Sequence, residues 1–345
     1  MKAKVVTGEQ IEDVVNCIKA GDIAVIPTET VYGIAADCLN ERAVNKIFKV
    51  KERAKDNPIN ILISDIYMLD SVAKPLSDIE MTLINAFWPG AFTIILDKTD
   101  NVPDIVTAGR KTIGVRMPDH ELAKSIIRKV GVPLAVPSAN ISGKPSGTSV
   151  EDIKKELEDS IQYIVDDGEC SVGLESTVVK VIKNEVVILR PGNVTLEEIQ
   201  AIGLKAKYDE NIFKEPENIE TELSPSLKYR HYAPATKCIL IDPKDKEDEY
   251  IKALEVIQGI KEKKILVICK RENVRKYNES NVVAAIDMGS REDYAQISKN
   301  IFHLLRKVDK YNVDLVIIEG VKSEGVGVAI MNRLIRACAY NVIEA

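Results

Sequence analysis

The sequence contains few histidines and no closely spaced cysteines. Among its 345 residues are three histidines and six cysteines, and no two cysteines have the C-x-x-C spacing. This pattern suits neither a zinc site nor a disulfide framework, and it is typical of a reducing compartment. Three histidines also make a metal cluster or a histidine-based triad hard to assemble. We therefore predict a cytoplasmic protein with no protein-bound metal centre, whose chemistry depends on positioning and charge.

Positive charge, aromatic residues and long apolar runs are scarce as well. The net charge is −6 and aromatic residues make up 5% of the chain. The chain therefore has neither the basic field nor the interleaved aromatic residues of a nucleic-acid-binding protein. No run approaches the roughly 20 apolar residues that span a bilayer, and the first residues turn polar before a signal-peptide core could form. We expect no membrane partner and no strong direct binding of nucleic acid.

Two common motifs of phosphate binding and nucleophilic catalysis are missing. The chain has no G-x-x-x-x-G-K-[ST] phosphate loop and no G-x-S-x-G nucleophile elbow. The nearest sequence to a dinucleotide-binding motif, GVGVAI at 325–330, lacks the third glycine. We interpret it as the tightly packed start of a helix.

The pattern of apolar residues predicts two α/β domains of unequal size. The chain is too long for one ordinary core. Over 1–205, strands and helices intermix, which indicates a mixed sheet with helices. Residues 206–236 contain three prolines and many charges without a clear period, and we predict that they form a linker. Residues 237–345 alternate regularly between the two element types, which indicates a smaller Rossmann-like α/β domain.

The expected elements of the first domain follow from the positions of the apolar runs. Its strands are expected at 22–26, 59–64, 92–96, 112–116, 133–137, 162–165, 176–182 and 185–189. Its helices are expected at 8–20, 41–52, 78–87, 119–130, 150–158 and 195–202. Capping boxes are expected at Thr148 with Glu151 and at Thr195 with Glu198. In the second domain we expect strands at 237–241, 264–269, 282–286 and 314–318, and helices at 248–262, 292–311 and 326–339.

Polar side chains cluster next to apolar strands of the first domain, the usual place for ligands in open α/β sheets. They include four cations: Lys51, Arg53, Arg116 and Arg190. Arginine suits bidentate contact with phosphate, and lysine acts as a point charge. We expect Arg116 and Arg190, which close two strands, to point toward the same rim of the sheet. Taken one by one, these segments also have ordinary explanations as turns, caps and solvated helix ends. Together they could bind a triphosphate and a small polar acid.

The polar segments belong to a series of motifs that spans nearly the whole chain. They are PTETVYG at 27–33, K-x-R with N-P at 51–58, PSAN with S-G at 137–147, STVV at 176–179, RPG at 190–192, SPSLKYRHYAP at 224–234 and GVAIMNRLIRA at 327–337. The series resembles the threonylcarbamoyl-AMP synthase family in its long form. That resemblance implies an N-terminal YrdC-like domain with a mixed twisted sheet, followed by a smaller Rossmann-like domain.

Two positions depart from the family pattern. The chain has Ser226 where the family linker usually has glycine. Many long-form relatives place a histidine in the strand after Asn-Pro, where this chain has Ile61, Leu62 and Ile63. A threonine contact from that strand is therefore not carried over to this chain.

The resemblance implies a nucleotidyltransferase reaction with ATP, L-threonine and bicarbonate as substrates. The products would be threonylcarbamoyl-AMP and pyrophosphate, in the first step of threonylcarbamoyladenosine (t6A) modification of tRNA. Mg²⁺ would accompany ATP as the cofactor, held mainly by phosphate oxygens and water. A downstream tRNA threonylcarbamoyl transferase complex would receive the product.

The resemblance also implies a role for individual residues. Threonine would be bound by Thr30, Tyr32, Arg116, Ser138 and Ser176. ATP would be bound by Arg53, Asn57, Asn140, Ser146, Arg190, Arg230, His231 and Tyr232. Lys51 and Arg53 would be the catalytic cations beside the phosphates. The linker residues among them would fold over the nucleotide as a lid.

Two other functions fit parts of the pattern. An RNA-binding module of YrdC-like fold without adenylating activity would also present a cationic sheet, but the acidic net charge argues against it. A carbamoyl-transfer domain of the hydrogenase-maturation kind shares the YrdC-like domain. Such proteins carry additional cysteine-rich and acyl-phosphatase segments, and this chain has none.

Overall fold

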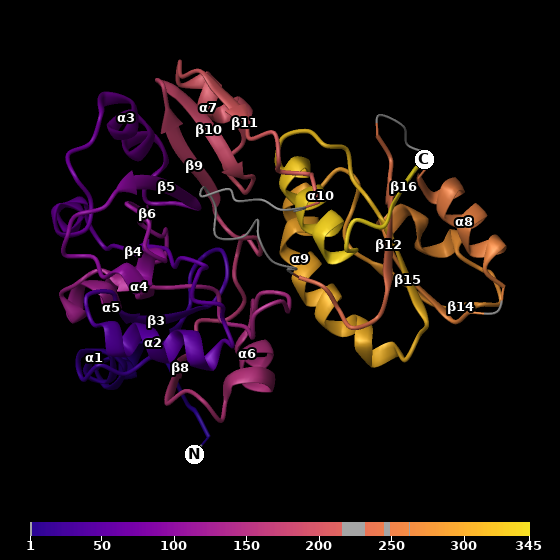
Figure 1. Ribbon diagram of the computed structural model, residues 1–345. Helices are drawn as coiled ribbons and strands as arrows, with labels where there is room; N and C mark the ends of the chain where they lie inside the picture. Colours follow the sequence, from indigo (N-terminus) through magenta and orange to yellow (C-terminus); the bar gives the residue numbers. More distant parts are fainter. Residues whose placement is uncertain (1, 216–231, 245–248, 262) are drawn as a thin grey trace. The chain divides into compact units, whose positions relative to one another are not determined.

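The computed structural model describes residues 2–215, 232–244, 249–261 and 263–345. The chain divides into two compact units. Among the described residues, the first unit contains 2–142 and 146–212, and the second contains 143–145, 213–215 and 232–345. Each unit has its own sheet and helices (Figure 1).

The first unit is built on an 11-stranded mixed sheet with the strand order β1-β8-β2-β3-β7-β4-β6-β5-β9-β10-β11. Its strands are β1 (Lys4–Val6), β2 (Ala24–Ile26), β3 (Gly33–Asp37), β4 (Ile61–Leu62), β5 (Phe92–Asp97), β6 (Thr112–Arg116), β7 (Leu134–Ala135), β8 (Tyr163–Val165), β9 (Thr177–Ile182), β10 (Glu185–Arg190) and β11 (Ala206–Tyr208). Its helices are α1 (Ile11–Lys19), α2 (Glu41–Val50), α3 (Asp78–Phe87), α4 (Asp104–Thr107), α5 (Glu121–Val130), α6 (Val150–Leu157) and α7 (Leu196–Ala201), with 3₁₀ turns η1 (Gly8–Gln10) and η2 (Ile66–Ser71). The predicted mixed α/β class is confirmed.

The sheet of the first unit is covered on both faces. Successive side chains of a strand point to opposite faces, and in β2 both sets are buried. Val25 belongs to the larger core, together with residues of α2, α3 and α6. Ala24 and Ile26 belong to a second core, together with residues of α1 and α5. Burial on two faces explains why this strand is a continuous apolar run without alternation.

Three strands of this sheet were not predicted. β1 and β11 are short edge strands, and β3 (sequence GIAAD) is rich in residues with low β-propensity. β11 lies within 206–236, the range predicted as a linker, and pairs in parallel with β10. The sheet therefore continues past residue 205. The beginning of the predicted linker is therefore a strand, because the backbone of β11 forms hydrogen bonds with β10.

One predicted helix cap is wrong and another is confirmed. The N-cap of α6 is Ser149, whose hydroxyl accepts from the Asp152 N–H, so Thr148 does not form the predicted capping box. At α7, Thr195 and Glu198 form the predicted box, with both reciprocal hydrogen bonds present. Each cap pairs backbone N–H groups that the first helical turn leaves without partners.

The second unit has a five-stranded sheet with the order β14-β13-β15-β12-β16. The strands are β12 (Cys238–Asp242), β13 (Ile265–Cys269), β14 (Val282–Asp287), β15 (Leu315–Glu319) and β16 (Val342–Glu344). Every neighbouring pair is parallel. The helices are α8 (Glu249–Gly259), α9 (Tyr294–Lys307) and α10 (Val326–Ala337), with 3₁₀ turns η3 (Arg271–Lys276) and η4 (Val308–Tyr311).

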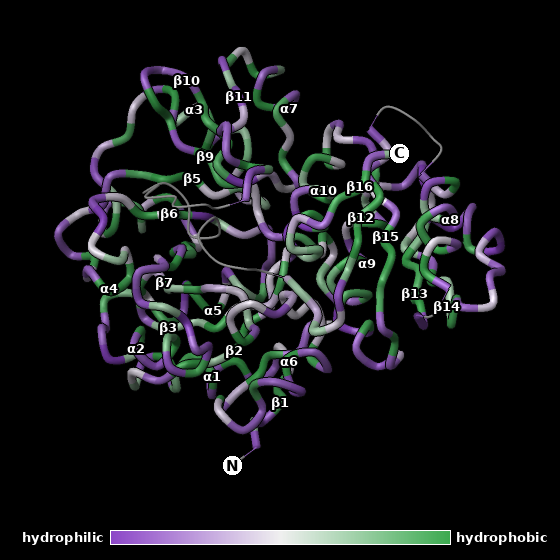
Figure 2. The backbone as a smooth tube through the Cα atoms, turned by 45° about the vertical axis from the view of Figure 1, so that its right-hand side comes forward, coloured by the Kyte–Doolittle hydropathy of each residue, from purple (hydrophilic) through white to green (hydrophobic). Residues whose placement is uncertain are grey.

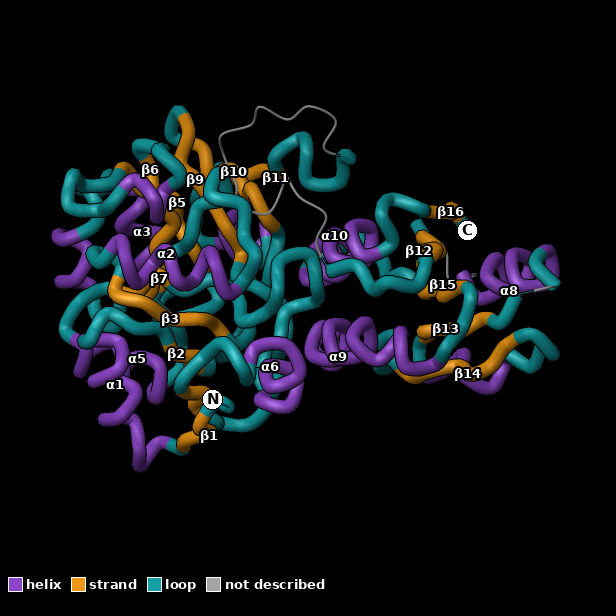
Figure 3. The backbone as a smooth tube through the Cα atoms, turned by 60° about the horizontal axis from the view of Figure 1, so that its bottom comes forward, coloured by secondary structure: helices purple, strands orange, loops and turns teal. Residues whose placement is uncertain are grey.

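Helices cover both faces of this parallel sheet. Helix α8 lies on one face, and α9 and α10 lie on the other (Figure 3). The strands β12, β13 and β15 are almost entirely hydrophobic (Figure 2), as expected for strands buried on two sides. The predicted Rossmann-like α/β arrangement is confirmed, and its parallel sheet lies between two layers of helices.

Two further observations concern the whole of the described chain. All six cysteines are buried and unpaired. Among the described residues, no helix combines the length and apolar character that a membrane crossing requires.

Candidate active site

The loop between β2 and β3 carries two buried threonines. Thr28 is 4% exposed and Thr30 1% exposed, and their hydroxyl oxygens lie 2.9 Å apart. The Thr28 hydroxyl donates to the carbonyl oxygen of Val31 at 2.7 Å. These bonds connect the residues of the loop to one another, and Thr30 lies within hydrogen-bonding distance of the end of β6.

Arg116, the last residue of β6, connects this loop to the sheet. Its Nη1 donates to Thr30 Oγ1 at 2.7 Å, and its Nε donates to the carbonyl oxygen of Gly90 at 2.9 Å. Its Nη2 lies 2.6 Å from Glu29 Oε1 in a buried ion pair. The structure thus brings together Arg116 and Thr30, two residues predicted to bind threonine.

Glu29 is a member of this group that the sequence analysis missed. Burial alone would raise the pKa of its carboxyl, but the charge of Arg116 and the N–H of Asp119 outweigh burial and lower the pKa below its usual value. Glu29 therefore carries a full negative charge at neutral pH. The sequence did contain a signal for Glu29, since it is a charged residue between two threonines in an otherwise apolar segment. A charge that is buried in such a segment must be paired.

Lys51 holds the loop that follows β7. Its side chain is fully buried, and its Nζ donates to the carbonyl oxygens of Ser138 at 2.5 Å and Asn140 at 2.6 Å. Ser138 Oγ in turn donates to Asn140 Oδ1 at 2.6 Å. These two bonds use two of the three N–H donors of the ammonium group. Loop 138–140 therefore defines the position of the Lys51 side chain. The structure brings together the predicted residues Lys51, Ser138 and Asn140.

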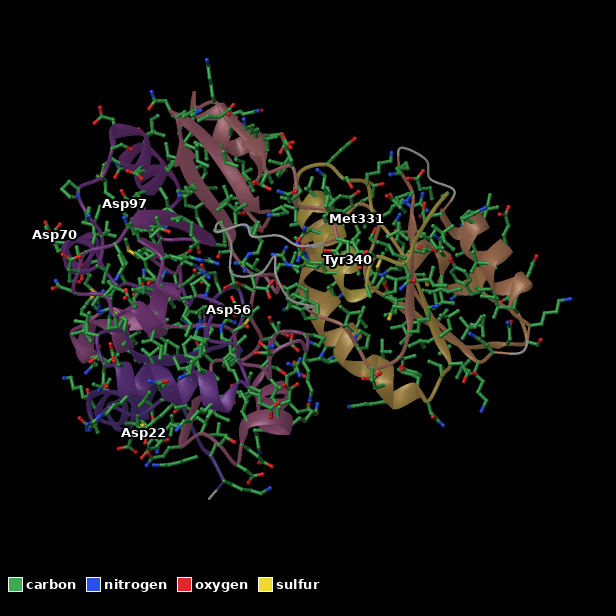
Figure 4. The ribbon with its side chains drawn as sticks, viewed as in Figure 1. Asp22, Asp56, Asp70, Asp97, Met331 and Tyr340 are labelled. Carbon is green, nitrogen blue, oxygen red and sulfur yellow. The ribbon has the colours of Figure 1, made fainter. Side chains whose placement is uncertain are left out.

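Arg53 and Asn57 form a second small cluster after α2. Arg53 Nε donates to the carbonyl oxygen of Asn57 at 3.1 Å, and Nη2 donates to that of Pro58 at 2.7 Å. Asn57 is 5% exposed, and its Oδ1 has no hydrogen-bond partner among the described residues. Asp56, labelled in Figure 4, is the turn residue immediately before Asn57. No described hydrogen bond joins this cluster to Arg116 or Arg190.

Arg190 closes β10 and binds the start of β9. Its Nε and Nη2 both donate to the carbonyl oxygen of Ser176, at 3.1 and 2.9 Å, and Nη2 also reaches Ser176 Oγ at 3.2 Å. Ser176 Oγ is 2.7 Å from Thr93 Oγ1. Nearby, Ser146 Oγ donates to Glu175 Oε1 at 2.6 Å. Thr93 and Glu175 are further polar residues that were not predicted: Thr93 lies within an apolar strand, and Glu175 directly precedes the STVV motif.

The strand directions show which of these residues share an edge. β6 is antiparallel to β5, β5 is parallel to β9, and β9 is antiparallel to β10. β6 and β10 therefore run in the same direction. Arg116 and Arg190 therefore lie at the same rim, as expected. β4 lies between β6 and β7 and is parallel to β6 but antiparallel to β7. Ser138 therefore follows a strand that runs in the direction opposite to β6. Residues 27–33 link the two groups, since Thr30 contacts Arg116 and Gly33 pairs with Ser138.

Tyr32 uses its hydroxyl within the protein. The hydroxyl donates to the carbonyl oxygen of Gly168 at 2.6 Å and accepts the N–H of Asp167. Burial raises its pKa well above the usual value. A cavity of about 120 Å³ adjoins this tyrosine and is also lined by Glu29, His120 and Cys170.

The predicted lid residues have different outcomes. Arg230 and His231 lie outside the described residues. Tyr232 belongs to the second unit, where its ring stacks on Phe302 at 5.1 Å and lies 5.8 Å from the Arg333 guanidinium. The strand in which many relatives have histidine is apolar and buried here, with Leu62 4% exposed.

Taken together, the fold and the site define a two-domain α/β protein with hydroxyl and cationic groups gathered at the ends of one mixed sheet. Residues 16–192 match the family described as Telomere recombination, and residues 194–339 match the family described as Threonylcarbamoyl-AMP synthase, C-terminal domain. The chain belongs to the threonylcarbamoyl-AMP synthase family, as the motif resemblance predicted.

Similar proteins are found in archaea and bacteria. The threonylcarbamoyl-AMP synthase of Pyrococcus abyssi is 38% identical over 330 residues, covering 95% of this chain and 93% of the relative. That of Bacillus subtilis is 37% identical over 336 residues, covering 97% and 94%. A crystal structure described as P. abyssi Sua5 complexed with L-threonine matches with a TM-score of 0.90 at 35% identity, covering 99% of this chain and 100% of the other.

Proposed function

We propose that this chain is a nucleotidyltransferase that makes L-threonylcarbamoyl-AMP and pyrophosphate from L-threonine, bicarbonate and ATP. This reaction is the first step of t6A modification of tRNA. The observation that carries the proposal is the match, over nearly the full length, to relatives named threonylcarbamoyl-AMP synthase. The similar structure described as a complex with L-threonine supports the identity of the amino-acid substrate.

The proposed chemistry needs no nucleophile from the protein. The threonine amine attacks bicarbonate and a carbamate forms with loss of water. A carbamate oxygen then attacks the α-phosphate of ATP, and pyrophosphate leaves. The protein would accelerate these steps by aligning the substrates and stabilising phosphate charge, which are tasks for hydroxyl groups and cations.

The amino-acid end of the proposed site consists of Thr30, Arg116, Ser138 and Ser176. Arg116 and Thr30 are in direct contact, so the cation and the hydroxyl can act on one ligand. Tyr32 would contribute its ring, because its hydroxyl is bound to Gly168 and Asp167.

The nucleotide end of the proposed site consists of Arg53, Asn57, Asn140, Ser146 and Arg190. We assign Lys51 to the shaping of loop 138–140, because its Nζ binds the Ser138 and Asn140 carbonyls. Mg²⁺ would arrive with ATP, bound mainly to phosphate oxygens and water. In the cell, the reaction would take place in the cytoplasm and supply a tRNA threonylcarbamoyl transferase complex.

Pyrophosphate release tests this proposal. The full-length protein should release pyrophosphate only when ATP, L-threonine and bicarbonate are all present. Arg53→Ala and Arg190→Ala should each lower kcat/KM at least 100-fold, because loss of one charge-stabilising donor typically costs 10²–10³ in rate. The far-ultraviolet circular dichroism should stay that of the wild type.

A matched control comes from an exposed arginine in the second unit. Arg271 pairs with Asp287 at 2.8 Å and is 52% exposed, and Arg271→Ala should leave the rate within twofold of wild type. Near-normal rates in both site variants, or pyrophosphate release without threonine, would refute the proposed function.

A further inference from the structure

Glu29 is a buried carboxylate to which the proposed chemistry gives no role. It is 8% exposed, and its partner Arg116 is 6% exposed. Glu29 Oε1 lies 2.6 Å from Arg116 Nη2 and accepts the N–H of Asp119 at 3.0 Å. A charge this deeply buried is costly unless it is paired, so the position of each partner depends on the other.

The contacts of Arg116 leave few directions in which it can act on a ligand. Nε is bound to the Gly90 carbonyl, and Nη2 is turned toward Glu29. Nη1 gives one N–H to Thr30. Nη1 has a second N–H beside Thr30, and no described hydrogen bond uses it.

The hydroxyl groups next to Arg116 have a defined polarity. Thr28 donates its only hydroxyl hydrogen to Val31, so the hydrogen between Thr28 and Thr30 comes from Thr30. Thr30 Oγ1 also accepts from Arg116 Nη1. It therefore has no hydrogen left to give and can only accept one from a ligand.

We propose that Glu29 is a positioning residue for the carboxylate end of the amino-acid substrate. By holding Nη2, it turns the guanidinium so that Nη1 reaches Thr30. The pair then presents one donor next to one acceptor. A molecule with a carboxylate beside a hydroxyl or amine group fits this pair, and L-threonine has both. The inference rests on the proposed function, because it takes the substrate to be an amino acid.

The test is Glu29→Gln in the full-length protein. Glutamine keeps the size of the side chain, and its amide nitrogen would replace Oε2, which has no hydrogen-bond partner among the described residues. The amide removes the charge, and with it the ion pair that holds Nη2. We expect the KM for threonine to rise at least tenfold, while the KM for ATP changes less than twofold.

Glu29→Asp provides a second variant in case Glu29→Gln folds poorly. It keeps the charge and withdraws it by one methylene, and we expect the KM for threonine to rise at least threefold. The matched control is Glu249→Gln, because Glu249 forms a similarly buried pair with Lys270 at 2.6 Å in the second unit. This control should leave both KM values within twofold of wild type.

Calorimetric titration of threonine separates this inference from the proposed function. If the wild type binds threonine but releases no pyrophosphate, the proposed function fails and the dissociation constants of the variants still test Glu29. An unchanged threonine affinity in a folded Glu29 variant would overturn the inference. So would equal losses of affinity for threonine and ATP, since a purely structural role predicts that result.

Discussion

His120 caps helix α5 with its imidazole ring. Nδ1 accepts the N–H of Ala123 at 3.4 Å, and Nε2 lies 3.3 Å from Asp167 Oδ2. Burial lowers the pKa of His120 below its usual value, although the Asp167 carboxylate acts in the opposite direction. The neutral ring suits the cap, because a protonated Nδ1 could not accept the Ala123 hydrogen.

Stability should therefore depend on pH through His120. In the unfolded chain the pKa is about 6.5, so below that pH the unfolded state binds a proton that the folded state does not. The free energy of unfolding should fall as the pH drops from about 6.5 toward the lowered pKa of the folded state, with a slope of at most about 1.4 kcal/mol per pH unit. Urea unfolding of wild type and His120→Asn at pH 5.5–8.0 measures this contribution, because asparagine retains a capping side chain. Identical pH slopes for the two proteins would contradict the assignment.

At the level of single residues, the sequence identified those whose polar side chains follow apolar strands. Arg190 was named because it closes a strand and Ser176 because of the motif resemblance, and the structure joins them through Ser176 O and Oγ. Glu29 was missed because its partner, Arg116, is 87 residues away along the chain and meets it only through tertiary packing. Lys51 was expected beside phosphate, but only the folded loop shows that its ammonium binds two carbonyl groups.

Among the elements, those with strong periodicity were predicted well and those defined by tertiary contacts were not. The strand 112–116 and the helix 78–87 have the predicted bounds. For α6, both Thr148 with Glu151 and Ser149 with Asp152 fit the capping pattern. The structure selects Ser149, and the Thr148 carbonyl instead accepts the N–H of Cys170. No local signal distinguishes the two registers, since both fit the same capping pattern.

Gly192, in the turn after β10, lies against the backbone at the start of β9. A Cβ atom at this position would lie 2.3 Å from Thr177 N and 2.6 Å from Ser176 C. Backbone atoms cannot rotate away, so we expect Gly192→Ala to destabilise the first unit by about 1–3 kcal/mol and to displace Ser176 from Arg190. Urea unfolding and pyrophosphate release should both show the loss.

A second glycine serves as the control for this substitution. A Cβ atom on Gly8 would meet Leu122 at ordinary contact distance, 3.6 Å. Gly8→Ala should therefore change the free energy of unfolding by less than about 1 kcal/mol, the size of the ordinary difference between glycine and alanine. If the two variants had equal stability, the close approach at Gly192 would not be what requires glycine there.

For the whole molecule, the sequence predicted two α/β domains because it shows two regimes of periodicity. The structure has an 11-stranded mixed sheet and a five-stranded parallel sheet, each with its own core. The strand order within the sheets was not predicted, because it is set by which apolar faces pack together and not by the order of elements along the chain. The extent of the first sheet was underestimated for the same reason, since β11 acquires its partner only in the fold.

Two separate cores should unfold in two separate transitions, because multidomain chains commonly depart from two-state behaviour. Ile317 in β15 is fully buried in the core of the second unit, and Ile317→Ala should cost about 2–5 kcal/mol there. In calorimetric scans this variant should lower one transition temperature and leave the other unchanged. ATP with threonine, each at about 100 times its dissociation constant, should raise the unaffected transition, since a ligand at that excess contributes about 2.7 kcal/mol. A single transition that both the substitution and the ligands shift together would mean that the two cores unfold as one cooperative body.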